Sequence, residues 1–159
     1  MRVETIRPNI SAATFLTGAQ FCDAFSVTID DATLDARRAA ERIFARQPRW
    51  VTMLMAARDR IVTPFGLKTE KIARSASNKV GFFPVLSETP ERLVAGLDDK
   101  HLDFRVVIDV AGTTQRRVTV TTIVLTHNRL GRLYLAIITP FHRVIVRALL
   151  RQIAARVSD

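Results

Sequence analysis

The sequence predicts an α+β domain in which an antiparallel sheet of about five strands is covered by a long C-terminal helix, with two helices after the first strand. Apolar and polar residues alternate along 101–110, as in a strand with one buried face. A run rich in Val and Thr follows at 117–127 and indicates a second strand. From 129 to 157, apolar residues recur at helical spacing and predict one amphipathic helix about 43 Å long. An antiparallel sheet with one apolar face needs a cover, and this helix is long and apolar enough to provide it.

The N-terminal part of the chain contributes the first strand and both of the following helices. Residues 1–20 show no clear period, so we expect an irregular arm. The stretch 23–29 alternates and predicts a strand, which would complete the sheet by pairing beside the last strand. Asp30–Asp31 offers an N-cap for a helix over 34–46. Apolar residues at helical spacing predict a second helix over 49–63.

Two further strands are expected before the alternating run, over 79–87 and 92–97. Pro84 indicates an edge position or a bulge in the first of them. Asn128 is a good N-cap for the C-terminal helix, and Pro140 should kink that helix or divide it into two segments.

The register of the last hairpin follows from side-chain parity. Leu102 must share a face with Thr126, and the pairing then continues in step along both strands. A slip by one residue would mix the apolar and polar faces. This register places His101 opposite His127.

Composition limits the classes of function. The 159 residues fit one domain over 1–159, and the single cysteine, Cys22, excludes an internal disulfide framework. Lys and Arg total 24 against 15 Asp and Glu, which gives a net charge of +9. The charge favours anionic partners, with a solubilising surface as the alternative, and because no nucleic-acid-binding signature accompanies it we expect no specific nucleic acid. The sequence has no Gly-rich dinucleotide loop and no cysteine-based metal motif, and we expect no cofactor and no metal.

The sequence also bears on location. The stretch from Pro8 to Cys22 is too polar for the apolar region of a secretory signal. The apolar run Leu133–His142 is far shorter than the roughly 20 residues that cross a bilayer. We therefore expect a soluble, cytoplasmic protein without a transmembrane segment.

Two resemblances refine the prediction. The element order resembles the helix-grip architecture of the START-like and Bet v 1-like superfamily, which curls a sheet around a C-terminal helix and often leaves a hydrophobic cavity between them. Several motifs resemble a bacterial family catalogued as domain of unknown function 2867: Trp50–Lys68, Gly81–Leu86, Gly96–Arg105, Thr126–Tyr134 and Pro140–Arg143. Members of that family also occur fused behind short-chain-dehydrogenase-like domains. The resemblance covers roughly residues 21–150 and implies a fold without an activity.

One polar set has chemical interest: His101, Asp103 and Arg105 share a strand face, with His127 opposite. Two histidines and a carboxylate can carry out acid–base chemistry or bind a metal. Parity puts this set on the face away from the covering helix, where a solvated, salt-bridged cluster is the ordinary outcome. Both interpretations stay open.

The second candidate is an inner pocket between the sheet and the C-terminal helix. A few polar groups in an apolar enclosure are typical of a small-molecule site. A filled core, in which the Thr hydroxyls bond locally, is the alternative. The residues expected to line the pocket are Phe82, Phe104, Val106, Thr122, Val124, Thr126, Tyr134, Ile137 and Phe141.

Other features have simpler interpretations. Apolar residues on the outer face, Val107, Ile123 and Leu125, indicate a dimer contact or cover from the first two helices. Cys22 fits a small buried hydrophobe better than a nucleophile, and the adjacent acids Asp98–Asp99 fit a turn better than a catalytic pair. One side of the C-terminal helix carries arginines that fit a solvated face, with phosphate or anionic-lipid binding as the alternative: Arg132, Arg143, Arg147 and Arg151.

Three hypotheses of function follow. The leading one is a small-molecule-binding domain of the START-like class, with a hydrophobic or anionic ligand. The second is a cyclase- or hydratase-like enzyme that uses His127 or His101 with Asp103. The third is an interaction module, either a homodimer or a partner of a reductase.

Overall fold

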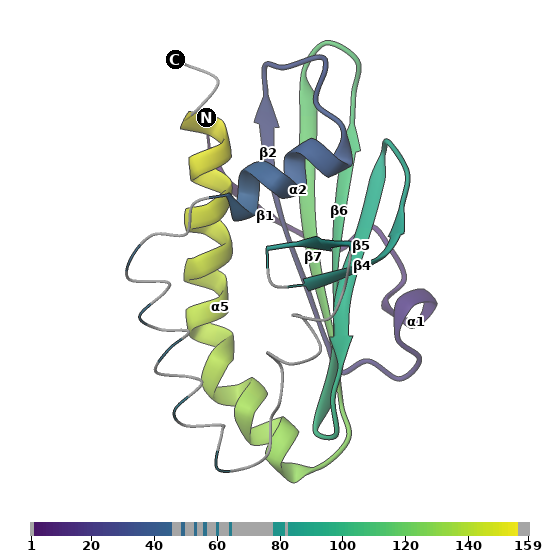
Figure 1. Ribbon diagram of the computed structural model, residues 1–159, viewed down its shortest axis with the longest axis vertical. Helices are drawn as coiled ribbons and strands as arrows, with labels where there is room; N and C mark the ends of the chain where they lie inside the picture. The colour runs from purple at the N-terminus through teal and green to yellow at the C-terminus, as the bar shows by residue number, and fades with distance from the viewer. Residues whose placement is uncertain are drawn as a thin grey trace.

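The computed structural model describes residues 2–45, 78–81 and 83–155, together with the isolated positions 49, 53, 56, 60 and 64. Among these residues the strands are β1 (Glu4–Ile6), β2 (Phe21–Ile29), β3 (Lys79–Val80), β4 (Phe83–Glu88), β5 (Arg92–Asp98), β6 (Leu102–Ala111) and β7 (Arg116–Thr126). The helices are α1 (Ala12–Phe15), α2 (Ala36–Phe44) and α5 (Arg129–Ala155). The α+β class is confirmed (Figure 1).

The strands form one antiparallel sheet in the order β1-β2-β7-β6-β5-β4-β3 (Figure 1). The predicted pairing of the first long strand beside the last is confirmed, because β2 pairs with β7. The predicted register of the last hairpin is also confirmed: Leu102 lies opposite Thr126, and the pairing continues in step to Val110 opposite Val118. This register gathers the apolar residues of β6 and β7 on one face, which we call the inner face.

The expectation of about five strands is wrong, because the described residues already form a sheet of seven. One additional strand is β1, which pairs with β2 and lies, like α1, in the arm expected to be irregular. The other arises because the strand expected over 79–87 is divided into β3 and β4 by a turn at Gly81, whose φ of +58° suits glycine. Strands of two or three residues are too short to show alternation.

The inner face is covered by α2 and α5. The N-cap of α2 is Asp35, whose side chain accepts the backbone N–H of Arg38 at 2.7 Å. The cap expected at Asp30–Asp31 is displaced because Asp31 accepts from the N–H and hydroxyl of Thr33 in the preceding turn. The second helix expected over 49–63 lies outside the described residues apart from four isolated positions. The largest fully buried side chains of this core are Phe25, Ile29, Leu34, Leu93, Ile108, Leu150 and Ile153.

A smaller core lies on the outer face. Val107 and Ile123 are fully buried there against residues of the segment 10–19, including Phe15 and Leu16. Figure 1 shows α1, which belongs to this segment, on the opposite side of the sheet from α5. The outer apolar strip is therefore covered by the N-terminal arm, whereas α2, the first of the two helices expected to cover it, lies on the inner face. Its apolar residues give no separate indication of a dimer contact.

The helix α5 bends in its N-terminal half, which contains Pro140 (Figure 1). The predicted N-cap is confirmed, because Oδ1 of Asn128 accepts the N–H of Gly131 at 2.9 Å. By length and composition alone α5 is apolar enough to cross a membrane, and 17% of its most apolar window is buried. Its C-terminal half belongs to the main core through the buried residues Val146, Leu149, Leu150, Ile153 and Ala154.

Candidate functional site

The end of the β6–β7 hairpin holds a histidine–carboxylate pair. The N–H of His127 donates to the carbonyl of His101 at 2.9 Å, which extends the strand pairing by one step. Nε2 of His127 lies 3.0 Å from Oδ2 of Asp103, and their side chains are 38% and 17% exposed. The other oxygen of Asp103 accepts the N–H of Asp99 at 3.2 Å. The carboxylate is thus held by the turn while the imidazole stays accessible, an arrangement that can accept or deliver a proton.

His101 packs against the start of α5. Its Nδ1 lies 2.8 Å from the amide nitrogen of Asn128. Because Oδ1 of Asn128 accepts the N–H of Gly131, the amide nitrogen is the atom that points at His101. Gly131 is buried, and a Cβ at this position would collide with the carbonyl of His101. These contacts lock the first turn of α5 against the end of the hairpin.

Arg105 does not join the histidine–carboxylate pair. Its Nη1 donates to Oδ1 of Asp98 at 2.6 Å and to a neighbouring backbone carbonyl at 2.9 Å. The structure therefore brings Asp103 and His127 together but engages Arg105 with Asp98. Asp98 and Asp99 serve the turn between β5 and β6, as the sequence indicates for adjacent acids at such a position.

The residues expected to line the inner pocket are only partly assembled. Those on the buried inner face are Val106, Thr122, Val124 and Thr126, with Phe104 and Tyr134 half-buried. Phe82 lies outside the described residues. Ile137 and Phe141 are 56% and 47% exposed, so the structure does not group them with the others.

The helical period explains this difference. The side of α5 that faces the sheet, its inward stripe, includes buried Val146. The residues four, seven and eleven positions before Val146 lie on the same side of the helix, and all three are half-buried: His142, Thr139 and Leu135. The apolar positions expected to face the pocket lie on a neighbouring stripe. In this part of α5 two polar side chains therefore take inward positions, and a more apolar stripe faces outward.

The inward position of His142 creates a second pair, which the sequence analysis missed. Nε2 of His142 lies 3.2 Å from Oδ1 of Asp23, and the two side chains are 21% and 13% exposed. The ring of Phe21 meets the imidazole edge-on, with centroids 6.0 Å apart. Oδ2 of Asp23 is buried and has no hydrogen-bond partner in the described parts of the chain. The sequence did contain a signal for Asp23. It lies two residues before Phe25, so the alternation of the strand places its carboxylate on the apolar face of β2.

The remaining reactive groups are the thiol of Cys22 and any side chains that could bind a metal. Cys22 is half-buried on the outer face, and burial, followed by the charge of Asp23, raises the pKa of its thiol. A raised pKa lowers the thiolate fraction at neutral pH, which disfavours a role as nucleophile. Among the described residues, no three His, Cys, Asp or Glu side chains are grouped so as to hold a metal ion.

Comparison with known proteins identifies the family of the chain. A family model described as a protein of unknown function, DUF2867, matches residues 15–149. The chain belongs to the DUF2867 family. No curated protein and no solved structure matches it. The DUF2867 match runs from the end of α1 into the packed part of α5, so it includes both histidine–carboxylate pairs, His127–Asp103 and His142–Asp23.

Proposed function

We propose that this DUF2867 domain binds a small hydrophobic or anionic molecule between the inner face of its sheet and α5, as START-like domains do. The observation that carries the proposal is the behaviour of α5 over 132–145. The structure describes this stretch throughout, and it contributes no buried side chain, although buried Gly131 and Val146 flank it. A helix that is fixed at both ends, with side chains no more than half-buried between them, leaves its middle available to a ligand.

The polar groups near this stretch support the same proposal. Oδ2 of Asp23 and Oγ1 of Thr126, both on the inner face, are buried without a hydrogen-bond partner among the described residues. Leaving such a group unsatisfied costs about 1–3 kcal/mol. A ligand with an apolar body and a hydrogen-bonding group would relieve this cost, and small-molecule sites combine apolar lining with a few polar groups in this way.

The first test looks for a ligand that accompanies the protein. The protein is purified gently, then denatured, and any released small molecule is identified by mass spectrometry. A stoichiometric hydrophobic or anionic compound supports the proposal. A crystal structure in which the chain's own side chains fill all the space between α5 and the inner face contradicts it.

The second test uses two matched threonines of β7. Both Thr126 and Thr121 have a buried hydroxyl without a partner among the described residues, but Thr126 lies on the inner face and Thr121 on the outer face. The probe is 8-anilinonaphthalene-1-sulfonate, which combines an apolar body with an anionic group. Thr126→Val should weaken its binding by about fivefold, the value of one hydrogen bond near 1 kcal/mol, and Thr121→Val should not change it. Equal effects of the two variants would place the probe elsewhere.

A second candidate function, a cyclase- or hydratase-like enzyme, is favoured by the 3.0 Å contact between His127 and Asp103. The pair satisfies the geometric condition for a general base oriented by a carboxylate. Once a released compound is identified, its conversion by the protein can be followed directly. His127→Gln should abolish conversion while binding persists, and His142→Gln serves as the control at the other pair. Unchanged conversion by His127→Gln would exclude this role.

A further inference from the structure

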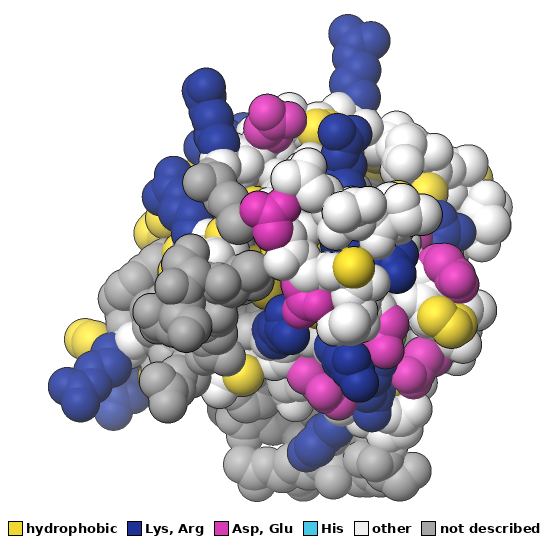
Figure 2. Space-filling view, turned by 90° about the horizontal axis from the view of Figure 1, so that it is seen from above, with side chains coloured by type: hydrophobic (Ala, Val, Ile, Leu, Met, Phe, Trp, Pro, Cys, Tyr) yellow, Lys and Arg dark blue, Asp and Glu magenta, His cyan; other side chains and the backbone are white. Residues whose placement is uncertain are grey.

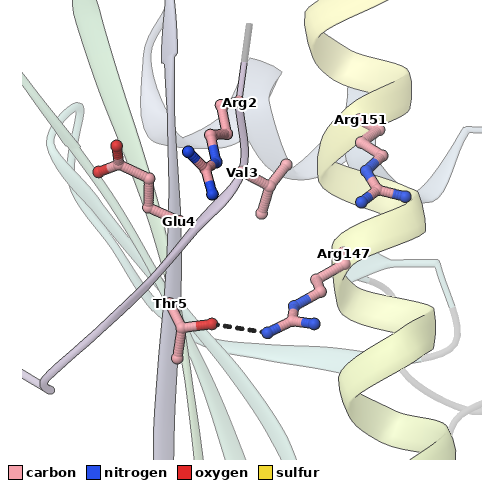
Figure 3. Close-up of a pocket in the computed structure, with 6 residues that line it drawn as sticks. All are labelled: Arg2, Val3, Glu4, Thr5, Arg147 and Arg151. Carbon is pink, nitrogen blue, oxygen red and sulfur yellow. Dashed lines mark hydrogen bonds between the residues drawn. The ribbon is translucent and has the colours of Figure 1, made fainter.

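A groove of about 680 Å³ lies between β1 and the C-terminal half of α5. Its lining residues are Arg2, Val3, Glu4, Thr5, Arg147 and Arg151 (Figure 3). Figure 3 shows Arg147 and Arg151 on successive turns of α5, with Arg147 reaching toward Thr5, while Val3 and Thr5 point toward α5 and Glu4 turns to the other side of the strand. The volume lies within the range of about 300–1,000 Å³ that is usual for small-molecule sites.

One of these arginines is held in place by its surroundings. Nη2 of Arg147 donates to Oγ1 of Thr5 at 2.8 Å, and the guanidinium carbon lies 5.4 Å from the ring centroid of Phe25. The hydroxyl and the aromatic face together fix the guanidinium, and contact with a ring is favourable for a cation. A guanidinium has five N–H donors, of which Thr5 uses one. Arg147 is therefore preorganised to bind an anion, with donors left over.

The arginines of the groove have no carboxylate partner among the described residues. Several arginines elsewhere lie within ion-pair distance of carboxylates, as in Arg37–Glu88, Arg42–Asp31, Arg92–Asp109 and Arg105–Asp98. Neither Arg147 nor Arg151 pairs with a carboxylate in the part of the chain that the structure describes. Spaced by four residues on one helix, the two positive charges repel each other. An anion between them would convert this repulsion into attraction.

The charged residues that line the groove favour an anionic ligand. Figure 1 places the N-terminus beside the C-terminal end of α5, and Figure 2 views the molecule from that end. Some Lys and Arg side chains in Figure 2 lie among Asp and Glu, whereas others project at the margin away from acidic side chains. The groove itself is lined by three arginines and one glutamate, which favours an anionic ligand.

We propose that this groove binds the phosphate group of a small ligand, held between Arg147 and Arg151. The planar fork of a guanidinium matches two phosphate oxygens, and two forks from successive helical turns suit a dianionic group. The hydroxyl of Thr5 accepts from Arg147 and keeps its own proton to donate to the phosphate. This site is separate from the ligand space proposed under the middle of α5, because it uses β1 and residues beyond His142.

The test measures binding of inorganic pyrophosphate by calorimetry at physiological ionic strength, where the Debye length is about 8 Å and diffuse attraction is screened. Replacing both groove arginines, Arg147→Gln with Arg151→Gln, should weaken binding by about tenfold or more, the value of lost charge-assisted hydrogen bonds. The control, Arg132→Gln with Arg143→Gln, removes the same charge from exposed positions of α5 outside the groove and should change binding by less than about twofold. Circular dichroism checks that both variants fold.

Two further arms complete the experiment. Arg147→Lys keeps the charge but loses the fork, so an intermediate loss of affinity supports bidentate recognition. Flotation with vesicles that contain phosphatidylglycerol distinguishes the source of the phosphate: capture that depends on Arg147 and Arg151 identifies a lipid headgroup, and pyrophosphate binding without capture identifies a soluble ligand. Equal weakening in the groove and control variants, or no binding of either probe, overturns the proposal.

Discussion

The two halves of α5 form a contrast within a single helix. Over 146–154 the helix buries five side chains in the main core, against α2 and the sheet. Over 132–145 it buries none, and its next buried residue toward the N-terminus is Gly131. One half therefore supplies the buried core side chains of the helix, and the other spans the sheet with side chains that are at most half-buried, among them Ile145, which packs against the core.

Physical chemistry accounts for the contrast. Full burial of a Leu or Ile side chain contributes about 1.5–3 kcal/mol, and the packed half places Leu150 and Ile153 in this position. The unpacked half turns His142 and Thr139 inward, and the hydroxyl of Thr139 bonds back to the carbonyl of Leu135 at 2.6 Å. The C-terminal turns of α5 thus stabilise the fold, and its middle turns remain available to a ligand.

The largest expected effect tests the contrast directly. Leu150→Ala removes a side chain that is fully buried in the packed half and should lower the free energy of unfolding by about 2–5 kcal/mol, because a cavity remains. Leu133→Ala makes the same change at an exposed position of the other half and should cost no more than about 0.5 kcal/mol. Urea denaturation of both variants measures the difference. Similar costs would show that the two halves are equally packed and would remove the contrast.

A smaller effect is expected at the N-terminal anchor of the helix. A Cβ at Gly131 would collide with the carbonyl of His101, a backbone atom that cannot rotate away. Gly131→Ala should therefore destabilise the protein by about 1–3 kcal/mol. It should also disturb the His101–Asn128 contact, which NMR of the histidine side chains can follow. Unchanged stability would mean that the first turn of α5 can shift without cost, so that only the packed half fixes the helix.

Much of the fold could be predicted from the sequence because the long elements carry long patterns. Ten residues of β6 and eleven of β7 alternate well enough to fix their register, and α5 repeats its apolar positions over 27 residues. The elements that were missed, β1 and α1, have three and four residues and depend on contacts with distant strands. Local pattern cannot show a strand whose only support is its neighbour in the sheet.

The candidate sites were harder to predict for a related reason. Parity placed Asp103 near His127 correctly, because both belong to one well-registered hairpin. The Asp23–His142 pair joins positions 119 residues apart, and its histidine lies on a stripe of α5 that is less apolar than the neighbouring one. The bend at Pro140 and the packing of the C-terminal half decide which stripe faces the sheet, and neither is visible in the spacing of apolar residues.

This missed pair gives the next prediction. His142→Leu leaves both oxygens of the largely buried Asp23 carboxylate, of which Oδ2 is fully buried, without a partner among the described residues and should destabilise the protein by about 1–3 kcal/mol. Asp23→Asn removes the charge that needs a partner, so it should lower the free energy of unfolding by less. The double variant should lower it by less than the sum of the two single variants. A coupling energy of about 1 kcal/mol from the double-mutant cycle would show that the contact between His142 and Asp23 stabilises the fold. Additive costs would mean that His142 and Asp23 are neighbours without interaction.

The smallest expected effect has the opposite sign and concerns the bend itself. Proline inside a helix costs about 3 kcal/mol, because it lacks an N–H and clashes with the preceding turn. The bend in the unpacked half relaxes part of this cost, so Pro140→Ala should raise the free energy of unfolding by only about 1 kcal/mol, measured as a rise in the midpoint of urea unfolding. If the bend also keeps the middle of α5 away from the inner face, the same variant should bind 8-anilinonaphthalene-1-sulfonate more weakly. A loss of stability would instead show that the packed half needs the bend, so that the two halves of α5 depend on each other.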